Sequence, residues 1–398
     1  MSQRPHSEIR SALLPRHPAV AYLFLVRPIQ RHTIASVLAV AVVAFFGCSM
    51  MASRVLAEDE NKAGPCTMAL EQSAVCESAN QRALEIMRTR NLEAITVVLD
   101  VHSGSLVAFA ASDPAKLDVT TPLLPLSTVK LMVAASWLDH EQDKTSGSPD
   151  GQRLVSDMIV SGNDNAGRRI ASALRTSIGA ESVLKDLERY GFPFFGTSAT
   201  PEKDTKFWIE VAPQWRDRLT PALSYHSLST QAARQDWEDT LSLGEAHFKV
   251  TALHVSRFLQ AVGNGGLMIP TVSRVEKTNA QTKSDAPSNP RRIMRGSAAL
   301  KLQAAMRAVV ERGTAKSVAN VLADTGWQIG GKTGTGPGPN APGPESDGWF
   351  AGLIFDPQGN ARFTIATFVK RGGYGGGNAA WISAELARFL IRTNAGRQ

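Results

Sequence analysis

The chain has 398 residues, of which 43% are hydrophobic and 20% charged, and this hydrophobic fraction excludes a wholly disordered protein. Its formal net charge is +7 at pH 7. Six arginines and one glutamate, a net +5, lie in residues 1–57, so the remaining residues are nearly neutral. A nucleic-acid-binding face that depends on bulk charge is therefore not expected.

A long uncharged segment near the N-terminus indicates export. Residues 33–52 carry no formal charge, and a helix of that length just crosses a bilayer. Arg27 and Arg31 precede it, and positive charge on that side keeps the N-terminus cytoplasmic. The sequence predicts a basic cytoplasmic leader over residues 1–32 and a transmembrane anchor or signal segment over 33–52. The domain then lies in the periplasm or at the outer face of the inner membrane, or is secreted after cleavage near Ala57.

Cysteine and histidine positions bear on redox state and metal binding. Cys48 lies in the apolar segment, which leaves Cys66 and Cys76 in the exported part. These two can form a disulfide in an oxidising compartment or remain free thiols, and both interpretations stay open. The histidines are scattered without metal-ligand spacing, so neither a metal nor a cofactor is expected.

The exported part begins with a stalk and a hairpin. Residues 53–90 indicate a polar stalk that ends in a short helix, and residues 91–398 form the main domain. Residues 95–99 and 106–110 are apolar runs joined by a glycine-containing turn, which is typical of a β-hairpin. A helix that is apolar almost all round follows from about Ser127, and such a helix is buried on every side.

Helices fill the middle of this domain, and strands return at its end. The expected elements are mainly helical segments over about 150–265, a polar loop over 278–290, a helix over 296–312, strands over 327–332, 348–355 and 362–369, and a final helix over 379–392. Strands from both ends of a domain share one sheet when helices are inserted between them. The sequence therefore predicts an α/β fold in which an antiparallel sheet is flanked by helices, with a mainly helical subdomain inserted over about 131–265.

The first of three motifs that carry candidate chemistry is Ser127-Thr128-Val129-Lys130. Residues three apart on a helix share a face, so the Lys130 amine is expected within reach of the Ser127 hydroxyl. Burial and a neighbouring cation such as Lys332 would lower the pKa of Lys130 and make it a general base. In the alternative, Ser127 only caps the helix and Lys130 lies at the surface.

The second motif is Ser161-Gly162-Asn163. A hydroxyl and an amide two residues apart on a tight turn can face one cleft, where the hydroxyl relays a proton and the amide binds a peptide-like substrate. The alternative is a simple Asn-Gly turn that caps the next helix, and the motif alone does not decide between the two.

The third motif, Lys332-Thr333-Gly334 followed by Thr335, ends a predicted strand. Its ammonium and hydroxyl groups suit a carboxylate, and its glycine lets a ligand approach the backbone. Residues 326–333 also match the phosphate-loop spacing formally. The residues before Lys332 indicate a strand, however, and the prolines after Thr335 prevent the helix that a phosphate loop requires.

In this order the three motifs resemble those of the penicillin-recognising serine acyltransferases, which include penicillin-binding proteins and serine β-lactamases. Residues 95–110 resemble the opening hairpin of the transpeptidase branch. Residues 250–270 and 346–355 resemble the helix before its last motif and the strand after it. The resemblance covers roughly residues 91–395 and implies a β-lactamase/transpeptidase-like fold.

The resemblance also implies a role for each motif residue. Ser127 is the nucleophile that a D-Ala-D-Ala stem peptide or a β-lactam acylates, Lys130 activates it, and Ser161 relays the proton. The backbone N–H groups of Ser127 and Thr335 form the oxyanion hole. The substrate-binding residues are then Asn163, Lys332, Thr333, Gly334 and Thr335.

The implied function is that of a peptidoglycan D,D-transpeptidase-like penicillin-binding protein, whose partners are stem peptides, β-lactams and, through residues 33–52, the membrane. A D,D-carboxypeptidase or a serine β-lactamase would use the same nucleophile. A β-lactamase needs a base that activates water, and Glu181, Glu188 and Glu202 lie where such a base would fall. A further alternative is a penicillin-binding sensor or scaffold without turnover.

Overall fold

The computed structural model describes residues 70–119, 121–140, 149–192, 230–245, 249–269, 290–337 and 343–394. All of them belong to one compact unit that spans residues 63–398. The predicted leader, the predicted membrane segment and all of the polar loop over 278–290 except its last residue lie outside the described residues. Among the helices that are described, none combines the length and the apolar character that a membrane crossing requires.

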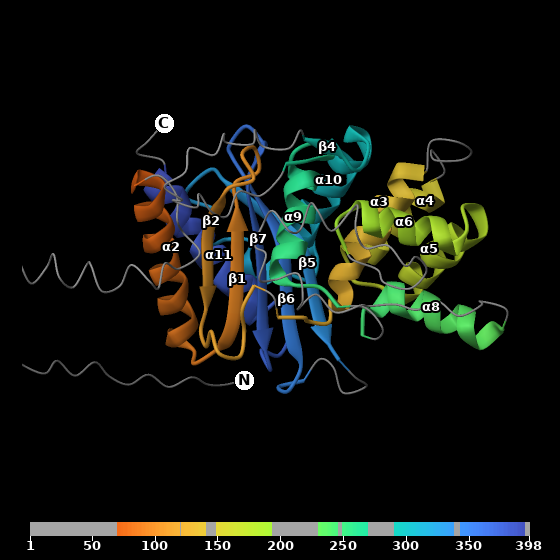
Figure 1. Ribbon diagram of the computed structural model, residues 1–398, viewed down its shortest axis with the longest axis horizontal. Helices are drawn as coiled ribbons and strands as arrows, with labels where there is room; N and C mark the ends of the chain where they lie inside the picture. Colours follow the sequence, from red (N-terminus) through yellow and green to blue (C-terminus); the bar gives the residue numbers. More distant parts are fainter. Residues whose placement is uncertain are drawn as a thin grey trace, which may run out of the picture. The chain divides into compact units, whose positions relative to one another are not determined.

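A five-stranded antiparallel sheet forms the centre of this unit (Figure 1). Its strands lie in the order β2-β1-β7-β6-β5. The N-terminal hairpin joins the C-terminal strands through the pairing of β1 with β7, so the predicted shared sheet is confirmed. The strands are β1 (Glu93–Leu99), β2 (Leu106–Ala111), β5 (Gln328–Gly336), β6 (Asp347–Phe355) and β7 (Ala361–Lys370), and a separate two-stranded ribbon pairs β3 (Leu267–Met268) with β4 (Arg291–Arg292).

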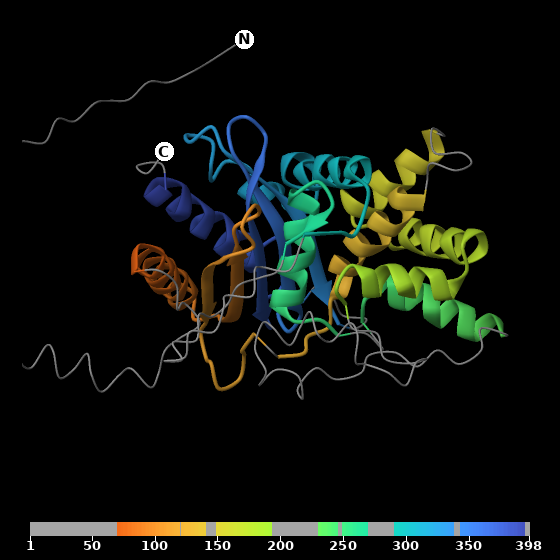
Figure 2. The ribbon, with the colours of Figure 1, turned by 45° about the horizontal axis from the view of Figure 1, so that its top comes forward.

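Helices cover both faces of the sheet (Figures 1 and 2). Thr364 and Thr367 of β7 point to opposite faces because their spacing is odd. Thr364 is hydrogen bonded to Ser256 of α9, whereas Thr367 accepts a hydrogen bond of 2.9 Å from Ser383 of α11. One face therefore carries α9 (Ala252–Gly263) and α10 (Gly296–Arg312), and the other carries α2 (Leu70–Thr89) and α11 (Asn378–Asn394).

Helix α2 lies within the segment that the sequence assigns to a stalk. It buries Ala79, Ala83 and Ile86 and packs on β2, and Asn80 Oδ1 accepts a hydrogen bond of 2.7 Å from the backbone N–H of Phe109. Cys76 is disulfide-bonded, and the other two cysteines lie outside the described residues. The described part of the predicted stalk is therefore a helix packed on the sheet.

The inserted helical part lies beside the sheet, next to β5 (Figure 1). It contains α3 (Val129–His140), α4 (Pro149–Ile159), α5 (Asp164–Ser177), α6 (Ala180–Arg189) and α8 (Gln231–Leu243), and a 3₁₀ turn at Leu126–Thr128 leads into α3. The sequence extends this part to about residue 265, but α9 packs on β7 and β1 instead. Apolar periodicity predicts that a helix is buried, and it does not say which partner buries it.

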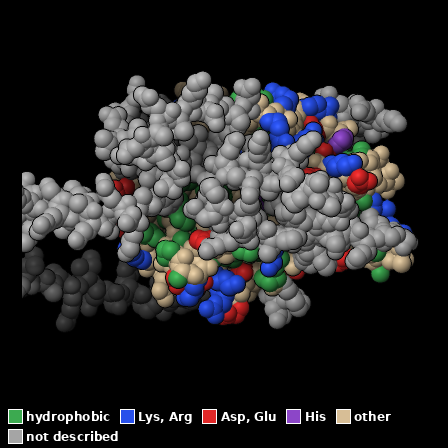
Figure 3. Space-filling view, viewed as in Figure 1, with side chains coloured by type: hydrophobic (Ala, Val, Ile, Leu, Met, Phe, Trp, Pro, Cys, Tyr) green, Lys and Arg blue, Asp and Glu red, His purple; other side chains and the backbone are tan. Residues whose placement is uncertain are grey.

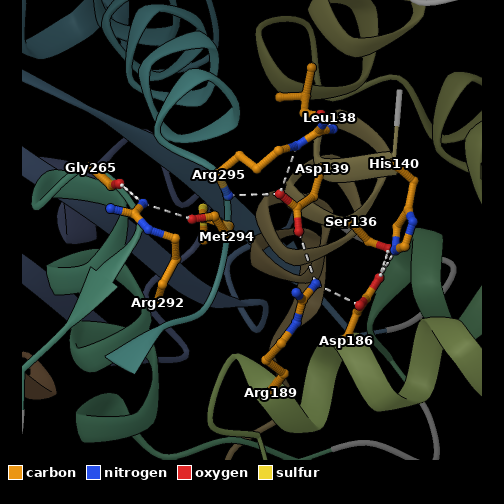
Figure 4. Close-up of polar contacts among 10 residues, drawn as sticks. All are labelled: Ser136, Leu138, Asp139, His140, Asp186, Arg189, Gly265, Arg292, Met294 and Arg295. Atoms are coloured by element: carbon orange, nitrogen blue, oxygen red, sulfur yellow. Dashed lines mark hydrogen bonds and ion pairs between the residues drawn. The ribbon is translucent and has the colours of Figure 1, made fainter. Parts of the chain in front are cut away.

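Helix α3 is buried almost all round, as predicted, and polar contacts hold its C-terminal end (Figure 4). Asp139 accepts hydrogen bonds from the Arg189 side chain at 2.9 Å and from the backbone N–H of Arg295 at 2.7 Å. Asp186 of α6 accepts one of 2.6 Å from Ser136 and is hydrogen bonded to His140 at 2.8 Å. These bonds tie α3 to α6 and to the start of α10, and so fix the helix that carries Lys130.

Surface charge is mixed where the structure describes it. The face drawn in Figure 3 shows Lys and Arg side chains close to Asp and Glu side chains. Exposed ion pairs such as Arg82–Glu85 and Lys185–Glu181 contribute to this mixing. Such a pattern agrees with the nearly neutral composition of the chain after residue 57.

Helix α9 begins with a buried capping box that makes stability depend on pH. The backbone N–H of Thr251 donates to His254 Nδ1 at 3.2 Å, and Thr251 Oγ1 accepts from the backbone N–H of His254 at 3.1 Å. Burial, reinforced by the Arg257 guanidinium, lowers the pKa of His254 to about 3. The unfolded chain takes up this proton near pH 6.5 and the folded chain does not, so stability is lost as the pH falls from about 6.5 towards 3.

We predict that the free energy of unfolding, measured in urea, falls by roughly 2 kcal/mol between pH 6.5 and pH 4.5 through His254, at about 1 kcal/mol per pH unit. His254→Gln should show a smaller decrease over the same interval. His102→Gln, which changes an exposed histidine, should behave as the wild type. Equal pH dependence in His254→Gln and the wild type would contradict this account.

Candidate active site

The serine and the lysine of the first motif are in direct contact. Lys130 Nζ donates a hydrogen bond of 2.7 Å to Ser127 Oγ and one of 2.6 Å to Asp164 Oδ1. The Lys130 side chain is completely buried, whereas Ser127 keeps partial exposure. The predicted contact between these two residues is therefore present, and the alternative of a surface lysine is wrong because α3 is buried on every side.

The backbone around Ser127 is tightly held. Leu126 has a φ of +51°, in the left-handed region that residues other than glycine rarely adopt. Its N–H donates to the carbonyl of Gly244 at 3.0 Å. A Cβ on Gly244 would lie 2.3 Å from the carbonyl oxygen of Leu126, and one on Gly334 would lie 3.2 Å from the Leu126 Cβ. Glycines at the end of α8 and in β5 therefore allow both elements to close on the turn that carries Ser127.

The third motif lies inside a strand. The sequence ends this strand at Lys332, but β5 continues to Gly336, which pairs with Asp347 of β6. Continuous pairing with β6 explains the extension, because every residue from Gln328 to Gly336 has a partner on β6 and the glycines do not interrupt the ladder. A strand that runs through Thr333 also excludes the phosphate-loop alternative, which needs a helix there.

Side chains of the third motif bond to their surroundings. Lys332 Nζ donates to the carbonyl oxygen of Thr333 at 2.8 Å. The hydroxyls of Thr333 and Thr314 are 2.6 Å apart. Thr335 Oγ1 accepts a hydrogen bond of 3.0 Å from the backbone N–H of Gly375.

A glycine-rich loop packs across β5 and β6. A Cβ on Gly375 would lie 2.1 Å from the carbonyl oxygen of Gly334 and 2.7 Å from that of Trp349, and one on Gly376 would lie 2.1 Å from that of Thr314. The Tyr374 hydroxyl donates to the same Thr314 carbonyl at 2.7 Å. The loop noted in the sequence over residues 371–378 therefore lies close against the strand that carries the third motif, and glycines allow this close approach.

The two lysines share one electrostatic environment. Burial lowers the pKa of Lys332 well below its usual value, the nearby Lys130 ammonium lowers it further, and the Asp164 carboxylate opposes both effects. Burial also lowers the pKa of Lys130, again against the carboxylate of Asp164. A lowered pKa increases the fraction of neutral amine near neutral pH, and a neutral amine is required of a base that deprotonates Ser127.

The second motif forms a turn whose backbone approaches Lys332. A Cβ on Gly162 would lie 3.7 Å from Lys332 Nζ and 3.7 Å from Thr314 Cγ2. Asn163 is exposed and caps α5, because its Oδ1 accepts a hydrogen bond of 3.0 Å from the backbone N–H of Ala166. Ser161 is exposed and makes no hydrogen bond within the described ranges. The helix cap that the sequence offered as an alternative for this motif is therefore present. The proton relay by Ser161 and the contact of Asn163 with the substrate amide stay predictions.

Two acidic residues of the site are absent from the motif-based prediction. Asp164 directly follows Asn163, and its carboxylate is bonded to Lys130. Glu245 lies beyond the end of α8, where a Cβ on Gly336 would lie 2.7 Å from its Oε1, and its charge acts on Lys130. The only sequence signal for Asp164 is its adjacency to the motif, and Glu245 has none, because the fold alone brings α8 to this site.

Among the residues that the structure describes, none of the glutamates considered from the sequence as a base that activates water is seen at this site. Glu181 is exposed and pairs with Lys185 at 2.9 Å on α6, and Glu202 lies outside the described residues. Within the parts of the chain that are described, no group of three His, Cys, Asp or Glu side chains could hold a metal ion.

Comparison with known proteins identifies the class of domain. Residues 196–388 match the family model of the penicillin binding protein transpeptidase domain. The matched segment includes Lys332, Thr333 and Gly334, and it begins after Ser127 and Ser161. This segment, slightly under half of the chain, is similar to that transpeptidase domain, and the resemblance drawn from the motifs is confirmed. A search of curated proteins finds no match to the chain.

Solved structures with the same fold cover most of the chain. A peptidoglycan glycosyltransferase from Burkholderia ambifaria has 17% sequence identity and a TM-score of 0.59, with 81% of this chain and 96% of that chain covered. Penicillin-binding protein 3 from Mycobacterium tuberculosis has 18% identity and a TM-score of 0.56, with 81% and 78% covered. The D,D-transpeptidase domain of a peptidoglycan glycosyltransferase from Eggerthella lenta has 16% identity and a TM-score of 0.57, with 80% and 82% covered. These likenesses confirm the predicted fold class.

The buried Lys332 ammonium should cost stability. Because its pKa in the folded state lies below 10.5, the unfolded chain binds more protons between the two values, and stability rises with pH across that interval. We predict that Lys332→Met raises the free energy of unfolding at pH 7 by roughly 1–4 kcal/mol, the range seen when buried ion pairs are replaced by apolar groups. The rise in stability between pH 7 and pH 10 should also flatten.

Urea unfolding at both pH values measures this effect. The matched control is Lys316→Met, which replaces an exposed lysine and should leave both values within about 0.5 kcal/mol of the wild type. A Lys332→Met variant that is less stable than the wild type at pH 7 would show that Lys332 stabilises the fold.

Proposed function

We propose that this protein is a D,D-transpeptidase-like penicillin-binding enzyme in which Ser127 is acylated by D-Ala-D-Ala stem peptides or by β-lactams. The contact that carries the proposal is the 2.7 Å hydrogen bond between the buried Lys130 amine and Ser127 Oγ. This pair lies close to Lys332, whose ammonium would supply the positive charge that binds a carboxylate-bearing substrate. On the sequence alone, we also propose that residues 33–52 hold this domain on the outer side of the membrane.

Acylation follows from the arrangement of these groups. Neutral Lys130 takes the proton of Ser127 as Oγ attacks the substrate carbonyl, and the leaving amine departs with a proton as the ester forms. The backbone N–H groups of Ser127 and Thr335 would stabilise the oxyanion, at about 3–4 kcal/mol per donor. Lys332, with Thr333 beside it, would attract the terminal carboxylate of the peptide.

β-Lactams are suitable probes of the proposal. Penicillin-binding protein 3 from M. tuberculosis, which shares the fold at 17% identity, has been solved in complexes with ampicillin and with aztreonam. A β-lactam that acylates the serine of such a site leaves a covalent label on the protein. Hydrolysis of β-lactams is the second candidate function, since the acidic Asp164 lies against Lys130.

The test is labelling of the full-length protein with a fluorescent penicillin, followed by gel electrophoresis. The wild type should carry a covalent label, and Ser127→Ala should carry none. Lys130→Met should be labelled roughly 100-fold or more slowly, the usual contribution of a general base. Transfer of a labelled stem peptide to an acceptor amine then measures transpeptidation directly.

The chain offers a matched control for this test. Ser182 and Lys185 repeat the S-x-x-K spacing on the surface helix α6. Ser182→Ala should therefore be labelled at the wild-type rate. Absence of label from the wild type, or an undiminished label on Ser127→Ala, would rule out acylation at this serine.

A further inference from the structure

Asp164 occupies an unusual place in the site. It is the first residue of α5, and its Oδ1 accepts the 2.6 Å hydrogen bond from Lys130 Nζ. The same nitrogen donates at 2.7 Å to Ser127 Oγ. One amine group thus links the carboxylate to the nucleophile, and the two oxygens are at most two hydrogen bonds apart.

Solvent reaches this carboxylate. The Asp164 side chain is 47% exposed, whereas the Lys130 side chain is 0% exposed. Its Oδ1 is held by Lys130, and within the described ranges its Oδ2 is bonded to no protein group. A water molecule can therefore bind to Asp164 on the open side of the site, next to the atom that would bear the acyl group.

The position of Asp164 is fixed by three helices. The Ser242 hydroxyl of α8 donates at 2.8 Å to the backbone carbonyl of Asp164. Gly167, one turn further along α5, packs so closely that an added Cβ would lie 2.5 Å from Ser242 Oγ and 3.4 Å from Lys130 Cε. Contacts with α3 and α8 therefore hold the first turn of α5, and the carboxylate is preorganised.

We propose that Asp164 is the general base that activates water to hydrolyse the acyl-enzyme, so that water, as well as an amine, can accept the acyl group. This inference rests on acylation of Ser127, as proposed above, and it concerns the next step, in which the ester on Ser127 is hydrolysed. Other carboxylates fit less well, because Glu181 is paired on the surface of α6 and Glu245 acts on Lys130 only through its charge.

The proposed step balances in atoms and protons. Water attacks the ester carbonyl carbon while Asp164 takes one of its protons, which gives a tetrahedral intermediate. As the bond between this carbon and Ser127 Oγ breaks, Asp164 passes the first proton to the neutral Lys130 amine along their hydrogen bond, and the ammonium formed in this way donates a proton to Oγ. The products are a free carboxylic acid and the original Ser127 hydroxyl.

Asp164→Asn separates a catalytic role from a positioning role. An asparagine Oδ1 still accepts a hydrogen bond from Lys130, but the amide cannot take a proton from water. We expect the variant to be acylated by fluorescent penicillin within about threefold of the wild-type rate, since the lysine stays oriented. Release of the label, chased with unlabelled penicillin, should be roughly 100-fold slower or more.

Asp157→Asn is the matched control, because the Asp157 side chain lies on α4 and pairs with Arg153 at 3.7 Å. It should acylate and deacylate as the wild type does. Wild-type deacylation should also be slower in D2O, since a proton moves in the step. Asp164→Ala provides a second variant, which should also keep its label and whose folding is checked by its thermal transition.

Different results separate the possible failures. Normal label release in folded Asp164→Asn and Asp164→Ala would overturn the proposal, as would slower acylation with unchanged release, which indicates a positioning role. Loss of hydrolysis in Glu245→Gln with normal release in Asp164→Asn would overturn it in favour of Glu245. Absence of label on the wild type instead contradicts acylation at Ser127 itself.

Discussion

Burial of the Lys130 amine is the constraint on which this site depends. An ammonium group removed from water must be compensated by hydrogen bonds or opposite charge, or it loses its proton. Lys130 finds both Ser127 and Asp164 as partners, while the neighbouring Lys332 is left with a backbone carbonyl. The start of α5 must therefore lie against the start of α3, and the pKa values of both lysines fall.

Glycines make that convergence possible. Gly244, Gly334 and Gly167 stand where a Cβ would meet a neighbouring backbone or side chain at van der Waals distance or closer. Each therefore allows one element to approach the Ser127–Lys130 turn: α8, β5 and α5 respectively. Side-chain bulk at these points would separate the charged groups by more than a hydrogen bond, and the shared electrostatic environment would weaken.

Patterns with a strong physical period were predicted well from the sequence. The apolar runs of β1 and β2, the apolar α3 and the i, i+3 contact of Ser127 with Lys130 all follow from local geometry. Side-chain orientations that depend on the geometry of a turn could not be predicted from the sequence. In the sequence Ser161 to Asp164, one backbone rotation decides which side chain faces Lys130, and the structure selects Asp164 while Asn163 caps α5. The packing of α9 on the sheet could not be predicted from the local sequence pattern either, since it depends on strands that are distant in the sequence.

Solved structures with 15–18% identity share this fold. On the function proposed above, formation of an ester on Ser127 would require the lysine pair and the oxyanion donors at the turn before α3 and on β5. The fate of that ester would depend on what stands at the open side of Lys130. A neutral side chain there would orient the lysine and leave the ester to an incoming amine. A solvent-exposed carboxylate, as in Asp164, would add a group that can deprotonate water, and a single position at the start of α5 would thereby decide whether water can compete with an amine.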